Sequence, residues 1–151
     1  MQDECFKRSQ QWAQVVQAHL DKSLYKHVKF DVMIAAALVS AKQQIEDISP
    51  FVRDTDEVVR LDSKHFLIFY YYTSIQESRY AIQNLYKRLQ NDGYESKIVC
   101  TDIKATDRYP LKLLQRLCAM SCHLDHKGKD YLASSKTDEV MEIFDVDLSD
   151  L

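Results

Sequence analysis

The residues of this chain best suited to chemistry are Arg53 and Asp56, which are separated by two positions in a polar turn. An arginine guanidinium is a planar fork that can form paired hydrogen bonds with a phosphate or a base edge, and it can stack on a base. The carboxylate of Asp56 could share in such recognition or simply pair with Arg53, and Asp54 adds negative charge beside them. Two interpretations are therefore open: a site for an anionic ligand, and a local ion pair that caps a strand without a ligand.

A second cluster, of cysteines and histidines, falls on a predicted helix near the C-terminus. Cys118 and Cys122 are four positions apart and could share a metal ion, but His123 points about 100° away from them and His126 lies a turn beyond. Structural zinc sites usually add a second pair of ligands elsewhere in the chain. We expect buried, reduced thiols with surface imidazoles and no metal site. No serine lies in a recognisable nucleophile turn, so no catalytic residue is predicted.

Composition excludes several other classes of function. A net charge of −3 and a pI near 5.9 argue against binding a long nucleic acid, even though Tyr70, Tyr71 and Tyr72 are similar to the stacking aromatics of an RNA-binding sheet. The chain has only two glycines, Gly93 and Gly128, so it has no glycine loop to cradle phosphate. The longest apolar run, residues 32–39, is about half a membrane span, and no membrane insertion is expected.

The first third of the chain predicts a helix, a strand and a second helix. Residues 6–22 have apolar side chains on one helical stripe. Residues 28–36 are rich in β-branched and apolar side chains and predict a buried strand. From residue 38 apolar side chains recur at spacings of three and four, which predicts a helix that ends near residue 49, because Pro50 follows.

The remaining elements complete an α/β sandwich. A hairpin is predicted from the strands 58–61 and 65–72, and a capping box formed by Ser74 and Glu77 begins the next helix, up to residue 90. A strand over 97–103, a helix over 111–126 and a last strand over 131–134 follow. We therefore expect helices packed against a mixed sheet, in the order α-β-α-β-β-α-β-α-β.

Residues 53–66 resemble the signature region of a GGDEF (diguanylate cyclase) domain. In that family an Arg-x-x-Asp turn is followed by five residues and then by a Gly-Gly-Asp-Glu-Phe hairpin, and residues 113–116 and 128–130 also fit the family pattern. The resemblance covers about residues 3–134 and implies a nucleotidyl-cyclase type of mixed sheet flanked by helices, with an extra N-terminal helix. The hairpin signature is degenerate and reads Asp62, Ser63, Lys64, His65, Phe66.

The resemblance also implies that the chain is not an enzyme. Joining two GTP molecules requires carboxylates that hold Mg²⁺ against the triphosphate. The carboxylate at the end of the family's first strand would fall on residues 34–37, which are Ile-Ala-Ala-Ala, and Lys64 and His65 replace the hairpin carboxylates. The family's phosphate-binding lysine falls on Asp125. We expect no Mg²⁺ and no other cofactor.

In active relatives the Arg-x-x-Asp turn is an inhibitory site for cyclic di-GMP. The resemblance therefore implies that Arg53 would hold a phosphate and guanine and that Asp56 would take a guanine edge. The family's second arginine falls on Asn84, and we add Arg79 and Arg88 as ligand-binding candidates because they lie nearby on the same predicted helix. A homodimer is also allowed, since family members often bridge two subunits through the ligand.

Two hypotheses for function follow. The first is a catalytically inactive signalling domain that acts as a cyclic di-GMP receptor through Arg53 and Asp56. The second is a ligand-free interaction or scaffold domain with an unknown protein partner. By resemblance, either would be a regulatory module of a bacterial cytoplasm, and substitution of Arg53 distinguishes them.

The end of the chain differs from the rest in composition. We divide the sequence into a degenerate GGDEF-like domain, residues 1–134, and an acidic C-terminal tail, residues 135–151, with spaced apolar side chains. The tail could be a mobile end or a short helix that packs on the domain, or it could be a partner-docking segment that orders on binding.

Overall fold

The computed structural model describes the backbone of residues 2–134 and the side-chain environment of residues 7–134. The sheet is mixed and has five strands in the order β2-β3-β1-β4-β5. Neighbours pair antiparallel except β4 and β5, which are parallel. The predicted tail, residues 135–151, lies outside the described residues. The strands are β1 (Ile34–Ala41), β2 (Glu57–Arg60), β3 (His65–Tyr71), β4 (Ser96–Asp102) and β5 (Tyr131–Ser134).

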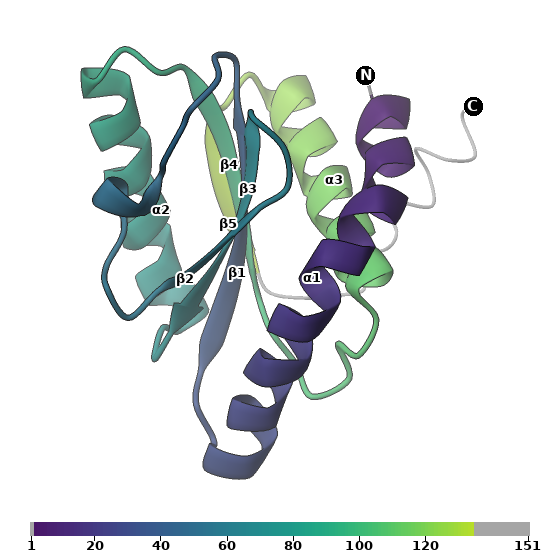
Figure 1. The fold of residues 1–151 in the computed structure, drawn as a ribbon. Helices are drawn as coiled ribbons and strands as arrows, with labels where there is room; N and C mark the ends of the chain where they lie inside the picture. Colours follow the sequence, from purple (N-terminus) through teal and green to yellow (C-terminus); the bar gives the residue numbers. More distant parts are fainter. Residues whose placement is uncertain (1, 135–151) are drawn as a thin grey trace.

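Helices cover both faces of this sheet (Figure 1). The helices α1 (Gln2–Phe30) and α3 (Pro110–Lys127) pack against each other over one face, and α2 (Ile75–Asn91) covers the other. Side chains alternate along a strand, so β1 supplies Leu38 to the α1/α3 side and Ala37 and Val39 to the α2 side. The expected α/β sandwich, with a mixed sheet and an extra N-terminal helix, is confirmed.

The N-terminal helix is longer than the sequence pattern predicts. It was expected to end near Lys22, with a strand beginning at residue 28, but α1 runs on to Phe30. It ends where Asp31 adopts a positive φ of 56° and the His27 ring bonds to the carbonyl of Val32, 2.9 Å away. The apolar residues of 28–30 belong to the exposed last turn of this helix, so their β propensity did not decide their conformation.

The predicted helix from residue 38 to residue 49 is wrong. Leu38 lies in β1, where it pairs with β3 on one side and β4 on the other. Beyond Ala41 the chain forms an irregular crossing, and only a 3-10 turn, Ser49–Phe51, follows. Ile45 and Ile48, which fitted a helical spacing, are instead fully covered anchors of this crossing in the α2-side core. The apolar residues at the end of β1, followed by the two buried isoleucines of the crossing, have the same three- and four-residue spacing as one face of a helix.

The rest of the predicted order is confirmed. The strands β2 and β3 form the expected hairpin. Both halves of the capping box are present, since Ser74 Oγ accepts from the Glu77 amide and Glu77 accepts from the Ser74 amide. Gly128 ends α3 with a φ of 62°, a left-handed conformation that favours glycine. No helix within residues 2–134 is long and apolar enough to cross a membrane.

The thiols differ from expectation at one position. Cys100 and Cys122 are free, and Cys100 is fully covered. Cys118, which was expected to be reduced, is disulfide-bonded. In the part of the chain whose side chains are described, no group of His, Cys, Asp or Glu residues is placed to hold a metal ion.

Candidate ligand pocket around Arg53

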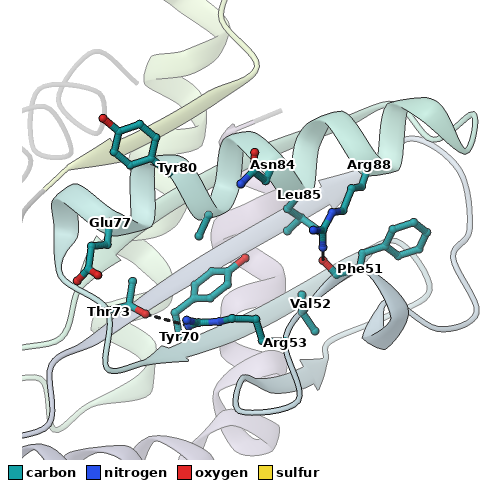
Figure 2. A pocket seen from close by; sticks show the side chains of 11 residues that line it. Phe51, Val52, Arg53, Tyr70, Thr73, Glu77, Tyr80, Asn84, Leu85 and Arg88 are labelled. Carbon is teal, nitrogen blue, oxygen red and sulfur yellow. Dashed lines mark hydrogen bonds between the residues drawn. The ribbon is translucent and has the colours of Figure 1, made fainter.

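A cavity of about 390 Å³ lies between α2 and the segment that carries Arg53. Figure 2 shows Arg53 and Tyr70 on one wall, with the side chains of α2 on the other. Its position follows from the fold, because β3 ends under the first turns of α2 and the chain entering β2 passes beside that end. The lining residues are Phe51, Val52, Arg53, Tyr70, Thr73, Glu77, Tyr80, Ala81, Asn84, Leu85 and Arg88.

Arg53 is fixed by Asp56. The two carboxylate oxygens of Asp56 accept from Nε of Arg53 at 3.2 and 3.1 Å, and one of them also accepts from Nη2 at 2.8 Å. The turn closes through the backbone as well, since the amide of Arg53 donates to Asp56 at 3.0 Å. The Asp56 side chain is fully covered, whereas that of Arg53 is 55% exposed. Asp56 therefore holds the guanidinium from behind and leaves its outer edge toward solvent.

The end of β3 holds the same guanidinium from a second direction. Nη2 of Arg53 donates to the hydroxyl of Thr73 at 3.0 Å and to the carbonyl of Tyr71 at 3.3 Å. The hydroxyl of Thr73, which is buried, in turn donates a hydrogen bond to that carbonyl at 2.9 Å. These bonds lie at the end of β3, where the next residue, Tyr72, turns the chain with a φ of 57°. They tie the turn before β2 to the junction of β3 and α2.

Electrostatics keep the guanidinium charged. The hydrogen bonds that Arg53 donates to Asp56 raise the pKa of Arg53 above its ordinary value. The guanidinium carbon lies 5.9 Å from the centre of the Tyr70 ring. Burial raises the pKa of Tyr70 far above its ordinary value, so that ring stays neutral. A permanent cation thus lies over the edge of a neutral aromatic ring at the cavity wall.

The wall formed by α2 has mixed charge. Nη1 of Arg88 donates to the carbonyl of Phe51 at 3.4 Å, which brings a second guanidinium to the cavity (Figure 2). Glu77 lies at the other end, and its hydrogen bonds with the Ser74 backbone and side chain lower its pKa, so the carboxylate is ionised at neutral pH. Tyr80 presents an exposed ring, and Asn84 presents an amide. The cavity offers donors for an anion, acceptors for N–H groups and aromatic surface.

The predicted site residues are only partly brought together. Arg53 and Arg88 line the cavity, and Asp56 lies directly behind Arg53. Arg79 is exposed and is not among the lining residues, so the structure places it outside. Asn84, on which the family's second arginine was expected to fall, lines the cavity. The prediction missed Thr73, Tyr70, Tyr80 and Glu77 as members of the site.

The hairpin turn at residues 62–65 is closed by its own hydrogen bonds. Asp62 accepts from the Lys64 amide at 2.9 Å, and its carboxylate lies 2.8 Å from Nδ1 of His65. Burial opposes ionisation of Asp62, but these bonds outweigh it and lower the pKa of the carboxyl. The ring of Trp12, from α1, lies 4.9 Å from the His65 ring. The carbonyl of Lys64 accepts the amide of Ala41 at the end of β1, and the carbonyl of Ser63 accepts the amide of Ile45 in the crossing that follows.

The end of β1 also differs from its expected position. The strand was expected to end within residues 34–37, but it continues to Ser40 and Ala41 beside the hairpin. Neither of these residues, nor the Lys42 that follows, has a carboxylate. The end of β1 therefore has no carboxylate, whether the strand is taken to end within residues 34–37 or at Ala41.

No protein-family model matches the sequence, and no curated protein matches it. Among the solved structures that are similar in fold are two GGDEF domains. One is the GGDEF domain of PA1120 (TpbB or YfiN) from Pseudomonas aeruginosa, at a TM-score of 0.68 and 13% identity, covering 85% of this chain and 91% of that one. The other is the GGDEF domain of DgcB from Caulobacter crescentus in complex with c-di-GMP, at a TM-score of 0.61 and 8% identity, covering 82% of this chain and 89% of that one. The chain therefore has the fold of a GGDEF domain.

Proposed function

We propose that this chain is a catalytically inactive GGDEF-like signalling domain that binds cyclic di-GMP at the cavity around Arg53. The observation that carries the proposal is the fixed guanidinium of Arg53. Asp56 and Thr73 hold it, and its edge is presented to a cavity that Arg88 also lines. A ligand that meets this arginine need not order a long side chain, so the entropy that ordering would cost is already lost in the folded protein.

The chemistry of the cavity suits a cyclic purine dinucleotide. The guanidinium groups of Arg53 and Arg88 can donate hydrogen bonds to the oxygens of a phosphate and offset its negative charge. The Glu77 carboxylate and the Asn84 side chain can accept the N–H groups of a guanine edge, and Tyr80 offers an exposed ring on which a base can stack. One structural neighbour, the GGDEF domain of DgcB, was solved with c-di-GMP bound. A cavity of about 390 Å³ has room for part of such a ligand, with the remainder in solvent.

Inactivity follows from the residues at the hairpin. Lys64 and His65 stand where the family has carboxylates, and the end of β1 has none to add. An Mg²⁺–triphosphate complex needs anionic ligands for its metal. An imidazole such as that of His65 cannot supply negative charge. This ring is already hydrogen-bonded to Asp62 and lies against the ring of Trp12. We expect no product with GTP and either Mg²⁺ or Mn²⁺.

The receptor function is tested by calorimetry with cyclic di-GMP. We expect micromolar or tighter binding to the unmodified chain and its loss in Arg53→Ala. Arg79→Ala is the matched control, since it removes an exposed arginine from the same side of the fold without touching the cavity. Absence of heat at millimolar ligand, or equal affinity in Arg53→Ala, would contradict the proposal.

A specific observation favours the second candidate, a ligand-free interaction domain. Large apolar side chains are exposed near the C-terminal end of α1, among them Tyr25, Val28 and Phe30. Exposed clusters of this kind mark contact surfaces more often than scattered single residues do. If the calorimetric test fails, this surface is the functional candidate, and Arg53→Ala is then expected to leave function intact.

A further inference from the structure

An apolar surface lies on the α1 side of the fold, at the end of the sheet where β1 begins. Rings of Tyr25 and Phe30 in the last turns of α1 meet with their centres 6.0 Å apart, and Val28 beside them is 67% exposed. Met33 and Tyr109 are also exposed, one just before β1 and the other just before α3. We call these five residues the end patch. The described residues leave this surface without a cover.

A groove of about 520 Å³ runs along this patch, between α1 and the segment joining β4 to α3. Figure 1 shows that segment looping beside the lower half of α1. Most of the groove wall is apolar, from Leu24, Tyr25, Val28 and Ala105. The groove is lined in full by Asp21, Leu24, Tyr25, Val28, Lys29, Ala105 and Arg108.

The wall opposite α1 is held rigidly. Asp107, which is 5% exposed, accepts from the buried guanidinium of Arg116 at 3.0 Å and from the amide of Lys104 at 2.7 Å. The amide of Asp107 in turn donates to the Lys104 carbonyl at 2.9 Å. Ala105 lies inside this closed turn and Arg108 directly follows it, so both reach the groove from a fixed backbone. A preformed groove costs its occupant less ordering than a flexible surface would.

The charges of the groove favour an acidic occupant. Lys29 and Arg108 both line it, and neither forms an ion pair with another residue whose side chain is described. The one acidic residue of the lining, Asp21, accepts a hydrogen bond from Gln17 at 2.9 Å. The groove therefore combines an apolar floor with two cationic side chains and one carboxylate, so its lining has a net positive charge.

The chain supplies a segment of matching chemistry that starts at this end of the sheet. Ser134, the last residue of β5, pairs with Thr101 at the carboxyl end of β4, a few residues before the groove wall at Ala105. Residues 135–151 can span up to about 55 Å when extended, so the groove is within reach. They hold six acidic residues and one basic residue. Apolar residues recur at helical spacings of three, four and three: Met141, Phe144, Leu148 and Leu151.

We propose that the acidic C-terminal segment, residues 135–151, docks in the groove between α1 and the 103–109 segment and covers the end patch. Its apolar stripe lies on Tyr25 and Val28, and its carboxylates face Lys29 and Arg108. The docked segment hides the surface that the chain would otherwise present to a partner. This docking does not depend on cyclic di-GMP binding.

The test is site-specific photo-crosslinking in the full chain. The photoreactive residue p-benzoylphenylalanine replaces Val28 in one variant and Val15 in the control. Val15 is also on α1 and is 48% exposed, but it does not line the groove. We expect the Val28 variant to give a monomeric product in which peptide mapping joins position 28 to residues 135–151. The Val15 control is expected to give none. Both positions are exposed, so circular dichroism should confirm that each variant is folded.

Charge reversal adds an independent readout. In the Val28 photo-variant, the pair Lys29→Glu and Arg108→Glu should reduce the yield of that product by about fivefold or more, since both favourable charge contacts become repulsive. Products that join two copies would identify a second copy as the occupant and overturn the proposal. So would the absence of any product with residues 135–151, or a yield that charge reversal leaves unchanged.

Discussion

At the scale of single residues, two buried threonine hydroxyls contribute differently to stability, because only one of them is hydrogen-bonded. Thr73 is buried with its hydroxyl bonded twice, to Arg53 and to the Tyr71 carbonyl. Thr101 is equally buried in β4, but its hydroxyl has no hydrogen-bond partner among the described residues. An unpaired buried hydroxyl has lost water without regaining a bond, whereas a paired one has regained it. The two threonines therefore form a matched comparison within one sheet.

We predict that Thr73→Val lowers the free energy of unfolding by about 1–2 kcal/mol, because it removes the buried hydroxyl that accepts from Arg53 and donates to the Tyr71 carbonyl. Thr101→Val should be neutral or stabilising, since it replaces an unsatisfied hydroxyl with a methyl group of similar size. Urea denaturation followed by circular dichroism measures both. Equal losses in the two variants would show that the Thr73 hydroxyl adds nothing to the hold on Arg53.

At the scale of elements, α1 is joined to the sheet by a polar network around Glu57, in β2. The carboxylate contacts the His19 ring and the Lys22 ammonium of α1, and it accepts from the Tyr71 hydroxyl at 2.9 Å. Tyr71 in turn contacts Ser23 of α1 at 2.9 Å. Burial opposes ionisation of Glu57, but the bonds from His19, Tyr71 and Lys22 outweigh it and lower the pKa of this carboxyl. Burial, together with the bond to Glu57, raises the pKa of Tyr71 to about 12.

This network predicts an acid-dependent stability. A carboxyl whose pKa is lowered in the folded state contributes stability above its unfolded value, near 4.5, and loses it as the pH falls through the lower folded value. Unfolding free energies measured between pH 6 and pH 3 should therefore fall less steeply in Glu57→Gln than in the unmodified chain. Tyr71→Phe, which removes one donor to Glu57 but keeps the carboxyl, should give an intermediate slope. Identical slopes in all three proteins would refute the assignment to Glu57.

The elements that the sequence predicts well are those with local chemical signals. The Ser74–Glu77 capping box marks the start of α2, and Gly128 marks the end of α3. The errors lie between residues 28 and 49, on either side of and within the nearly continuous apolar run at residues 32–41. Strand β1 is covered on both faces, so its pattern has neither period 2 nor period 3.6 over its length. Only the pairing with β3 and β4 identifies it as a strand.

The candidate site was predictable only in part for a similar reason. Arg53 and Asp56 are close in sequence, so their spacing alone revealed the pair. Thr73 and Tyr70 join them through the end of β3, and their roles depend on the β2–β3 register, which no residue spacing fixes. The choice of Arg88 over Arg79 depends on which side of α2 faces the crossing at Phe51. The capping box was the one available signal that placed Glu77 near the start of this helix.

On the scale of the whole molecule, the chain builds its α2-side core without a helix between β1 and β2. Ile45 and Ile48 of the irregular crossing are 1% exposed and pack in the same cluster as the inward side chains of α2. The crossing also supplies the amide of Ile45 to the hairpin carbonyl at Ser63, at 3.0 Å. We predict that Ile48→Ala costs about 2–4 kcal/mol of unfolding free energy, as for other large-to-small changes in a core. Val52→Ala, at a half-buried position of the same crossing, is the control, and its cost should be well under half as large.

The long N-terminal helix raises the question of whether it folds together with the rest. The only tryptophan of the chain, Trp12, lies in α1, is 3% exposed, and stacks near His65 of the hairpin. Its emission reports the docking of α1, whereas far-ultraviolet circular dichroism reports all the helices and strands. Because α1 shares one core with α3 and the sheet, we expect both signals to give the same urea midpoint and slope. In Trp12→Phe the dichroism midpoint should fall only modestly, since an aromatic ring still fills the site. A tryptophan transition at lower urea than the dichroism would mean that α1 undocks first, and the helix would then be a separable arm on a smaller folded unit.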